Sequence, residues 1–115
     1  MKNCDSLSEE NYSYYYSLPD NELLALLYDD KLTSHVLTFA AAVAGSKLPL
    51  NSALDILGKI ALSHSSALAR EGAIIGLSCQ DSDSHIIIAL FKLIIKTEEN
   101  ADLRLYCEDY ISTHS

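Results

Sequence analysis

The feature of this sequence that most constrains the fold is a recurrence at an offset of 34 residues. One copy contains Arg70 and the other Arg104. Cys107 then falls on Ala73, so a small side chain follows three residues after each arginine, and an aliphatic residue follows four positions later. A further step back loses the arginine, because Val36 falls on Arg70, but keeps the small and apolar positions. A period of this length suits a helix pair with its loops, which buries its apolar face by stacking on neighbouring pairs.

From Ser17 onward, six apolar blocks alternate with short polar breaks, and no stretch alternates as a hairpin strand would. The residues expected to cap these helices are Ser17, Thr33 or Ser34, Ser52, Asp83 or Ser84, and Asn100. Gly45 is expected to end the second helix. The block at 86–96 is apolar almost all round, so it is expected to form the most buried helix.

Residues 66–77 read Ser-Ala-Leu-Ala-Arg-Glu-Gly-Ala-Ile-Ile-Gly-Leu. This stretch resembles the second helix of a bacterial HEAT repeat, in which a loop leads into Val-Arg-x-x-Ala-x-x-x-Leu. The segment that follows Asn100 is similar in a weaker form. The resemblance covers 51–113 well and 18–50 poorly, and it does not reach 1–16. It implies an all-α fold, a short α-solenoid of about three HEAT-like antiparallel helix pairs, and a surface that binds other proteins.

The expected organisation is a polar, tyrosine-rich segment at 1–16 followed by one HEAT-like helical domain at 17–115. Gly72 and Gly76 each cost a helix about 1 kcal/mol, which indicates that a neighbouring helix packs closely against them. Arg70 and Arg104 lie near the starts of their helices, so each is expected to pair with a carboxylate of an adjacent repeat. For Arg70 the candidates are Asp102, Glu98 and Glu99.

The net charge of the chain indicates which class of partner it can bind. Its 115 residues include 8 Lys and Arg but 16 Asp and Glu, which gives a net charge of −8 and a pI near 4.7. Such a balance argues against a direct contact with the nucleic-acid backbone and favours a basic protein partner. Scattered acid pairs have two interpretations, a solvated surface or an acidic patch that engages this partner.

The cysteines and the termini bear on the compartment. Three cysteines at distant positions form no C-x-x-C pair, so free thiols, rather than a disulfide framework or a zinc site, are expected. The polar N-terminus does not read as a signal peptide, and no apolar run reaches the length of a membrane span. The sequence therefore predicts a cytoplasmic protein that does not contact membranes.

Catalytic and metal-binding patterns are not found in the sequence. The four histidines lie in four different blocks without a second ligand at helical spacing. The Ser63-His64-Ser65 stretch lacks a nucleophile elbow and an orienting acid. We therefore expect no catalytic residue, no cofactor, no metal and no small-molecule ligand, and the chain is not expected to be an enzyme.

Tyrosines are the strongest candidates for binding residues, because tyrosine is enriched at protein interfaces. A first group, at positions 12 and 14–16, either covers the first helix pair or contacts a partner. No Lys or Arg lies near it in the sequence to support base stacking. A second group lies in the last helix beside acidic residues. The candidate partner-binding residues are Tyr12, Tyr14, Tyr15, Tyr16, Glu71, Tyr106, Glu108 and Asp109.

The function expected from these features is that of a non-catalytic protein-interaction module. The sharpest version is a small acidic inhibitor, such as an immunity protein that blocks a basic toxin acting on nucleic acid. The alternatives are an adaptor or scaffold subunit of a larger complex and, less favoured because a basic groove is missing, a HEAT-type enzyme related to nucleic acid.

Overall fold

The computed structural model describes residues 9–29, 31–80 and 84–115, with side chains from residue 13 onward. All regular structure in these ranges is helical, which confirms the all-α prediction. The seven helices found there are α1 (Glu9–Ser17), α2 (Asp20–Tyr28), α3 (Ser34–Lys47), α4 (Leu50–Ser63), α5 (Ala67–Ser78), α6 (Ser84–Thr97) and α7 (Ala101–His114). The six predicted blocks correspond to α2–α7, and α1 is a helix that the sequence analysis did not predict.

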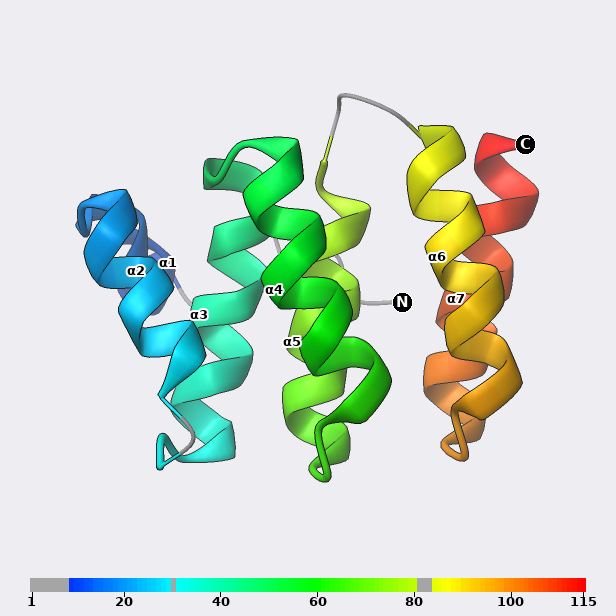
Figure 1. The fold of residues 1–115 in the computed structure, drawn as a ribbon, viewed down its shortest axis with the longest axis horizontal. Helices are drawn as coiled ribbons and strands as arrows, with labels where there is room; N and C mark the ends of the chain where they lie inside the picture. The colour runs from blue at the N-terminus through cyan, green and yellow to red at the C-terminus, as the bar shows by residue number, and fades with distance from the viewer. Residues whose placement is uncertain (1–8, 30, 81–83) are drawn as a thin grey trace.

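The helices α2 to α7 form two layers of three. In Figure 1, α2, α4 and α6 lie in front, and α3, α5 and α7 lie behind them. Consecutive helices α2 and α3, α4 and α5, and α6 and α7 pack as antiparallel pairs, whose connecting loops all lie at the bottom of the view (Figure 1). Helix α1 lies behind α2 and packs against α3 (Figure 1).

The three helices of the rear layer begin in the same way. The side chains of Thr33, Ser66 and Asn100 each accept a hydrogen bond from a backbone N–H in the first turn of α3, α5 and α7. Thirty-three residues separate the first two caps and 34 separate the second and third. The predicted offset therefore holds between α5 and α7, whereas α3 is one residue out of the predicted register.

This shift changes which residues of α3 face the core. At an offset of 33, Leu37 rather than Val36 occupies the position of Arg70, and Ala40 occupies that of Ala73. Leu37 and Ala40 are buried, whereas Val36 is only partly buried. The predicted 34-residue offset therefore gives the wrong register for α3.

Three predicted helix boundaries are wrong. Ser17 is the last residue of α1, and its hydroxyl donates to the carbonyl of Tyr14. Ser52 lies inside α4. Helices α2 and α4 instead begin after Pro19 and Pro49, whose fixed φ suits a helix start and whose carbonyls accept the first intrahelical bonds.

The third boundary is Gly45, which does not end α3. The helix continues to Lys47, and Gly45 lies where α3 crosses α5. A Cβ atom at Gly45 would collide with the backbone of Gly76, and Cβ atoms at Gly72 and Gly76 would collide with the backbone of α3. The two helices thus touch backbone to backbone, which confirms the close approach predicted from Gly72 and Gly76.

Helix α6 is not the most buried helix, contrary to the prediction. It buries four residues, whereas α3 and α5 bury seven each. Ile86 and Leu93 are 41% and 52% exposed. The reason is its place at the end of the front layer, where its main contacts are with α7 and α4, so part of its apolar surface has no neighbour in the described chain.

Of the two cysteines that the structure describes, one contradicts the expectation of free thiols. Cys79 is disulfide-bonded. Cys107 is a free and fully buried thiol, and Cys4 lies outside the described residues. None of the helices that the structure describes combines the length and the apolar character needed to cross a membrane.

Candidate functional site

The contact between α5 and α7 differs from the contact between α3 and α5. At the 34-residue offset, the glycines Gly72 and Gly76 of α5 are replaced in α7 by Tyr106 and Tyr110. The Tyr106 ring lies between α5 and α7, where no glycine allows a backbone contact like that between α3 and α5, whereas the Tyr110 ring packs on Phe91 of α6. A cavity of about 380 Å³ opens between α5 and α7.

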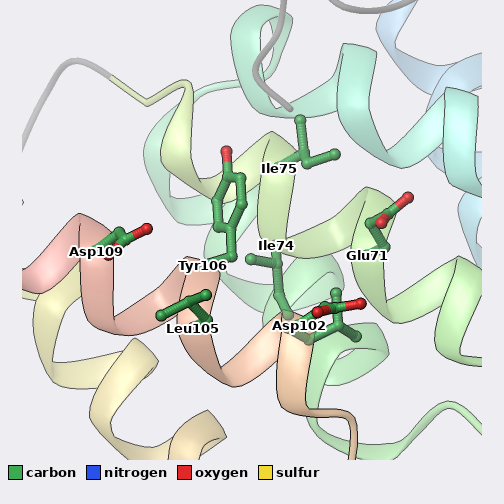
Figure 2. Close-up of a pocket in the computed structure, with 8 residues that line it drawn as sticks. Glu71, Ile74, Ile75, Asp102, Leu105, Tyr106 and Asp109 are labelled. Carbon is green, nitrogen blue, oxygen red and sulfur yellow. The ribbon is translucent and has the colours of Figure 1, made fainter. Parts of the chain in front are cut away.

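We call this cavity the α5–α7 groove. The described residues that line it are Glu71, Ile74, Ile75, Asp102, Leu103, Leu105, Tyr106 and Asp109. Its apolar surface combines buried side chains, such as Ile74 and Ile75, with Leu105, which is 56% exposed. In the view of Figure 2, the Tyr106 ring stands between Asp109 on one side and Glu71 on the other.

The charged residues that line the groove are all acidic. Its lining includes three carboxylates, those of Glu71, Asp102 and Asp109, and no Lys, Arg or His among the described residues. Burial raises the pKa of Tyr106, and the electrostatic effects of Cys107 and Glu71 raise it further. The hydrogen bond with Ser78 partly offsets this rise. The phenol therefore stays neutral at physiological pH and presents an apolar ring in an acidic setting.

Two polar contacts hold α5 and α7 together at the ends of the groove. At one end, the guanidinium of Arg70 binds both carboxylate oxygens of Glu98, at 2.8 and 3.0 Å. At the other end, the hydroxyl groups of Ser78 and Tyr106 lie 2.9 Å apart in a hydrogen bond. Arg70 and Ser78 are eight residues apart on α5, or about 12 Å along the helix axis.

The contact between Arg70 and Glu98 resolves the three candidates in favour of Glu98. Its carboxylate is buried, which alone raises the pKa, but hydrogen bonds from Arg70 and from the backbone N–H of Asn100 outweigh this effect, so the pKa of Glu98 is lowered. Arg70 also donates to the carbonyl of His64, 2.8 Å away. The guanidinium thus joins the loop before α5 to the loop before α7.

Arg104 reproduces only part of this arrangement. It donates to the carbonyl of Glu98, six residues before it, just as Arg70 donates to the carbonyl six residues before itself. Its hydrogen bond goes to a backbone oxygen, so the prediction that it pairs with a carboxylate is wrong.

The structure brings together three of the predicted binding residues. Glu71, Tyr106 and Asp109 line the same groove, whereas Glu108, although adjacent to Asp109, is exposed outside it. The sequence analysis missed Asp102 and the apolar lining residues. A signal for Asp102 existed, because residues 102, 105, 106 and 109 recur at helical spacing and so share one face of α7.

The tyrosines of α1 form a separate surface. Tyr14 and Tyr16 are 60% and 46% exposed, and Tyr15 is partly buried against the core. The Nζ atom of Lys47 lies 5.9 Å from the centre of the Tyr16 ring, so the absence of a nearby cation in the sequence does not hold in space. The side chain of Tyr12 lies outside the described residues. Tyr14, Tyr15 and Tyr16 do not line the α5–α7 groove.

The free thiol of Cys107 lies outside the residues that line the α5–α7 groove. Burial, reinforced by the charges of Glu98 and Glu108, raises the pKa of the Cys107 thiol to about 12, so it stays protonated and unreactive at neutral pH. Across residues 9–29, 31–80 and 84–115, no group of three His, Cys, Asp or Glu is placed to hold a metal ion.

Comparisons of this chain with protein-family models, with curated proteins and with solved structures find no match.

Proposed function

We propose that this chain is a non-catalytic protein-interaction module that binds a basic partner through the α5–α7 groove. The observation that carries the proposal is the combination of an apolar cavity of about 380 Å³ with three carboxylates in its lining. Apolar surface gives binding energy, and carboxylates select a cationic partner and speed its association. The net charge of −8 extends this preference over the whole molecule.

We further propose that the fold is a short α-solenoid of HEAT-like helix pairs. Two recurrences support it. The polar caps Thr33, Ser66 and Asn100 return every 33 or 34 residues. Arg70 and Arg104 each donate to a carbonyl six residues earlier. Solenoids of this kind present continuous surfaces to protein partners.

The most specific form of the proposal is a small acidic inhibitor, such as an immunity protein that blocks a basic toxin acting on nucleic acid in the cytoplasm. Size, negative charge and an acidic groove support it, because a basic active site can be covered by an acidic, aromatic surface. The alternative is an adaptor or scaffold subunit that binds a basic partner without affecting its activity. In either case the chain itself contacts no nucleic acid and no membrane.

The experiment is an affinity purification from the source cells with three forms of the protein as bait. The groove variant is Asp102→Asn/Asp109→Asn, which removes two carboxylates from the lining. The control variant is Glu99→Gln/Glu108→Gln, which removes two exposed carboxylates that do not line the groove. The expected result is one basic protein retained by the wild type and by the control, and lost from the groove variant and at high salt.

A partner retained equally by all three baits would contradict the groove as the binding site. An acidic partner would contradict the proposed charge preference. The purified partner then separates the two versions of the proposal: an inhibitor abolishes the partner's enzymatic activity at a molar ratio near one, whereas an adaptor leaves it unchanged.

A further inference from the structure

The α5–α7 groove runs between two helices and carries a regular pattern of charges. On α7, Asp102 and Asp109 are seven residues apart, which is two helical turns, or about 10.5 Å along the axis. Leu105 and Tyr106 lie between them in the sequence and line the same groove. One face of α7 therefore presents an acid, an apolar pair and a second acid in order.

From this order we infer that the groove binds a basic amphipathic α-helix of the partner, with cations at positions i and i+7 and aliphatic residues at i+3 and i+4. This inference rests on the proposed function, because it specifies which part of a basic partner enters the groove. A partner helix aligned with α7 has the same rise per residue, so its two cations match the spacing of Asp102 and Asp109. Its aliphatic pair then faces Leu105 and Tyr106.

A helix suits this groove better than an extended peptide. Within the described ranges, the walls of the groove are helices, whose central N–H and C=O groups are already bonded within the helix, and no strand edge is available. An extended peptide obtains much of its affinity from pairing its backbone with such an edge. A helix satisfies its own backbone and needs only side-chain contacts, which the groove provides.

The apolar lining gives the partner helix an anchor. Leu105 and the Tyr106 ring of α7 provide most of its exposed apolar surface, and Ile74 and Ile75 of α5, which are 1% and 3% exposed, lie buried beside them. The space between them accepts aliphatic side chains, which would cover the exposed half of Leu105. Glu71, on the α5 side, adds a third negative charge near the Tyr106 ring.

The test uses three synthetic peptides with the same alanine-rich background. The first carries Lys at two positions seven residues apart, with two Leu between them. The second has the same composition, but its lysines are five residues apart and so lie on different faces of the helix. The third is the first peptide with a central proline, which breaks the helix. Binding is followed by nuclear magnetic resonance shifts of the labelled protein at Ile74, Leu105 and Tyr106.

We expect the first peptide to bind with shifts at these three residues, and the other two peptides to bind at least about tenfold more weakly. The Asp102→Asn/Asp109→Asn variant should weaken the first peptide by about tenfold, and the control Glu99→Gln/Glu108→Gln should leave its affinity within about twofold. Circular dichroism of each variant confirms that the helical fold is intact.

Three outcomes would overturn the inference. The proline peptide binding in the groove as tightly as the first would mean that the occupant is extended, while a basic partner would still be supported. The five-residue spacing binding equally well would exclude the proposed register. Shifts at the groove residues that grow with the concentration of the protein alone would identify the occupant as a second copy of this chain. By contrast, if the wild-type bait retains no basic protein in the affinity purification, that result would contradict the proposed function.

Discussion

The contacts that α5 makes with α3 and with α7 differ in the size of the residues that meet. Toward α3, Gly72 and Gly76 meet the backbone of a helix that contributes its own Gly45. Toward α7, Ile74 and Ile75 meet Tyr106, and the groove opens between them. One helix thus has a side that is closed by backbone contact and a side that lines a cavity.

The difference shows that neighbouring helix pairs can be joined by unlike means. Small residues let α3 and α5 pack backbone to backbone, and the buried amide of Gln80, just after α5, donates to the carbonyls of Gly45 and Leu48 at one end of that contact. Large residues keep α7 away from α5, and the contact depends on polar bonds at its ends, from Arg70 to Glu98 and between Ser78 and Tyr106. A binding groove can therefore be present without disturbing the core.

The first prediction breaks the closed contact. We expect Gly45→Ala to destabilise the protein by roughly 3 kcal/mol, because the added methyl group collides with the backbone of Gly76, which cannot move without separating the helices. The free energy of unfolding in urea measures the effect. The matched control is Gly58→Ala, where the new Cβ meets Leu90 at an ordinary 3.4 Å.

The control should be neutral or stabilising by up to about 1 kcal/mol, because alanine is the better helix former. Equal losses of stability in the two variants would show that the approach of α3 to α5 is not as close as described.

The second prediction weakens the open contact. Arg70→Ala should cost about 3 kcal/mol, since it leaves the buried Glu98 carboxylate without its cation. Arg104→Ala should cost only about 1 kcal/mol, since that arginine loses one hydrogen bond to a carbonyl. Urea unfolding of both variants measures the difference, and a larger loss for Arg104→Ala would contradict the assigned roles.

The third prediction concerns acid. The pKa of Glu98 is lowered below its ordinary value of 4.5 in the folded protein. The resulting stability is present in full above that value and is lost as the pH falls through the lower, folded pKa. The free-energy difference between wild type and Glu98→Gln should therefore be constant near neutral pH and shrink below about pH 4.5.

Urea unfolding at several pH values follows this difference. A gap that widens as the pH falls would mean that the pKa of Glu98 is raised, which the hydrogen bonds from Arg70 do not permit.

The smallest effect is expected at the other end of the groove. Tyr106→Phe removes the hydrogen bond with Ser78 but keeps the ring, so we expect a loss of about 1 kcal/mol in stability. The apolar lining is preserved, and the affinity for the basic helical peptide should change by less than about twofold. A loss of stability as large as that of Arg70→Ala would show that this bond, rather than the ion pair, holds α7.

Particular residues show how far sequence reasoning reached. The sequence predicts Asn100 as one cap and Thr33 or Ser34 as another, because a cap bonds to backbone groups two or three residues away, and the structure has Asn100 and Thr33 in these positions. Gly72 and Gly76 indicated a close helix contact because glycine is otherwise unfavourable in a helix. Gly45 was misassigned, since a glycine that ends a helix and one that packs against a neighbour have the same local sequence.

For the same reason, the residues of the α5–α7 groove could be predicted only in part from the sequence. Tyr106, Asp109 and Glu71 were candidates by residue type, but Glu108 was equally so. Only the packing of α7 on α5 separates Asp109, which lines the groove, from Glu108, which does not. Likewise, the apolar pattern of α6 indicated burial, but its place at the end of a layer left Leu93 exposed.

The sequence by itself determined the six helices from α2 to α7, the cap of α7 at Asn100, the recurrence of Arg70 at Arg104 and the acidic charge. These properties depend on bonds between residues a few positions apart or on composition alone. The tertiary structure decided the carboxylate that Arg70 binds, the function of Gly45 and the opening of the α5–α7 groove. Each of these depends on the sizes of side chains that meet from distant parts of the chain, and only the packed fold brings them together.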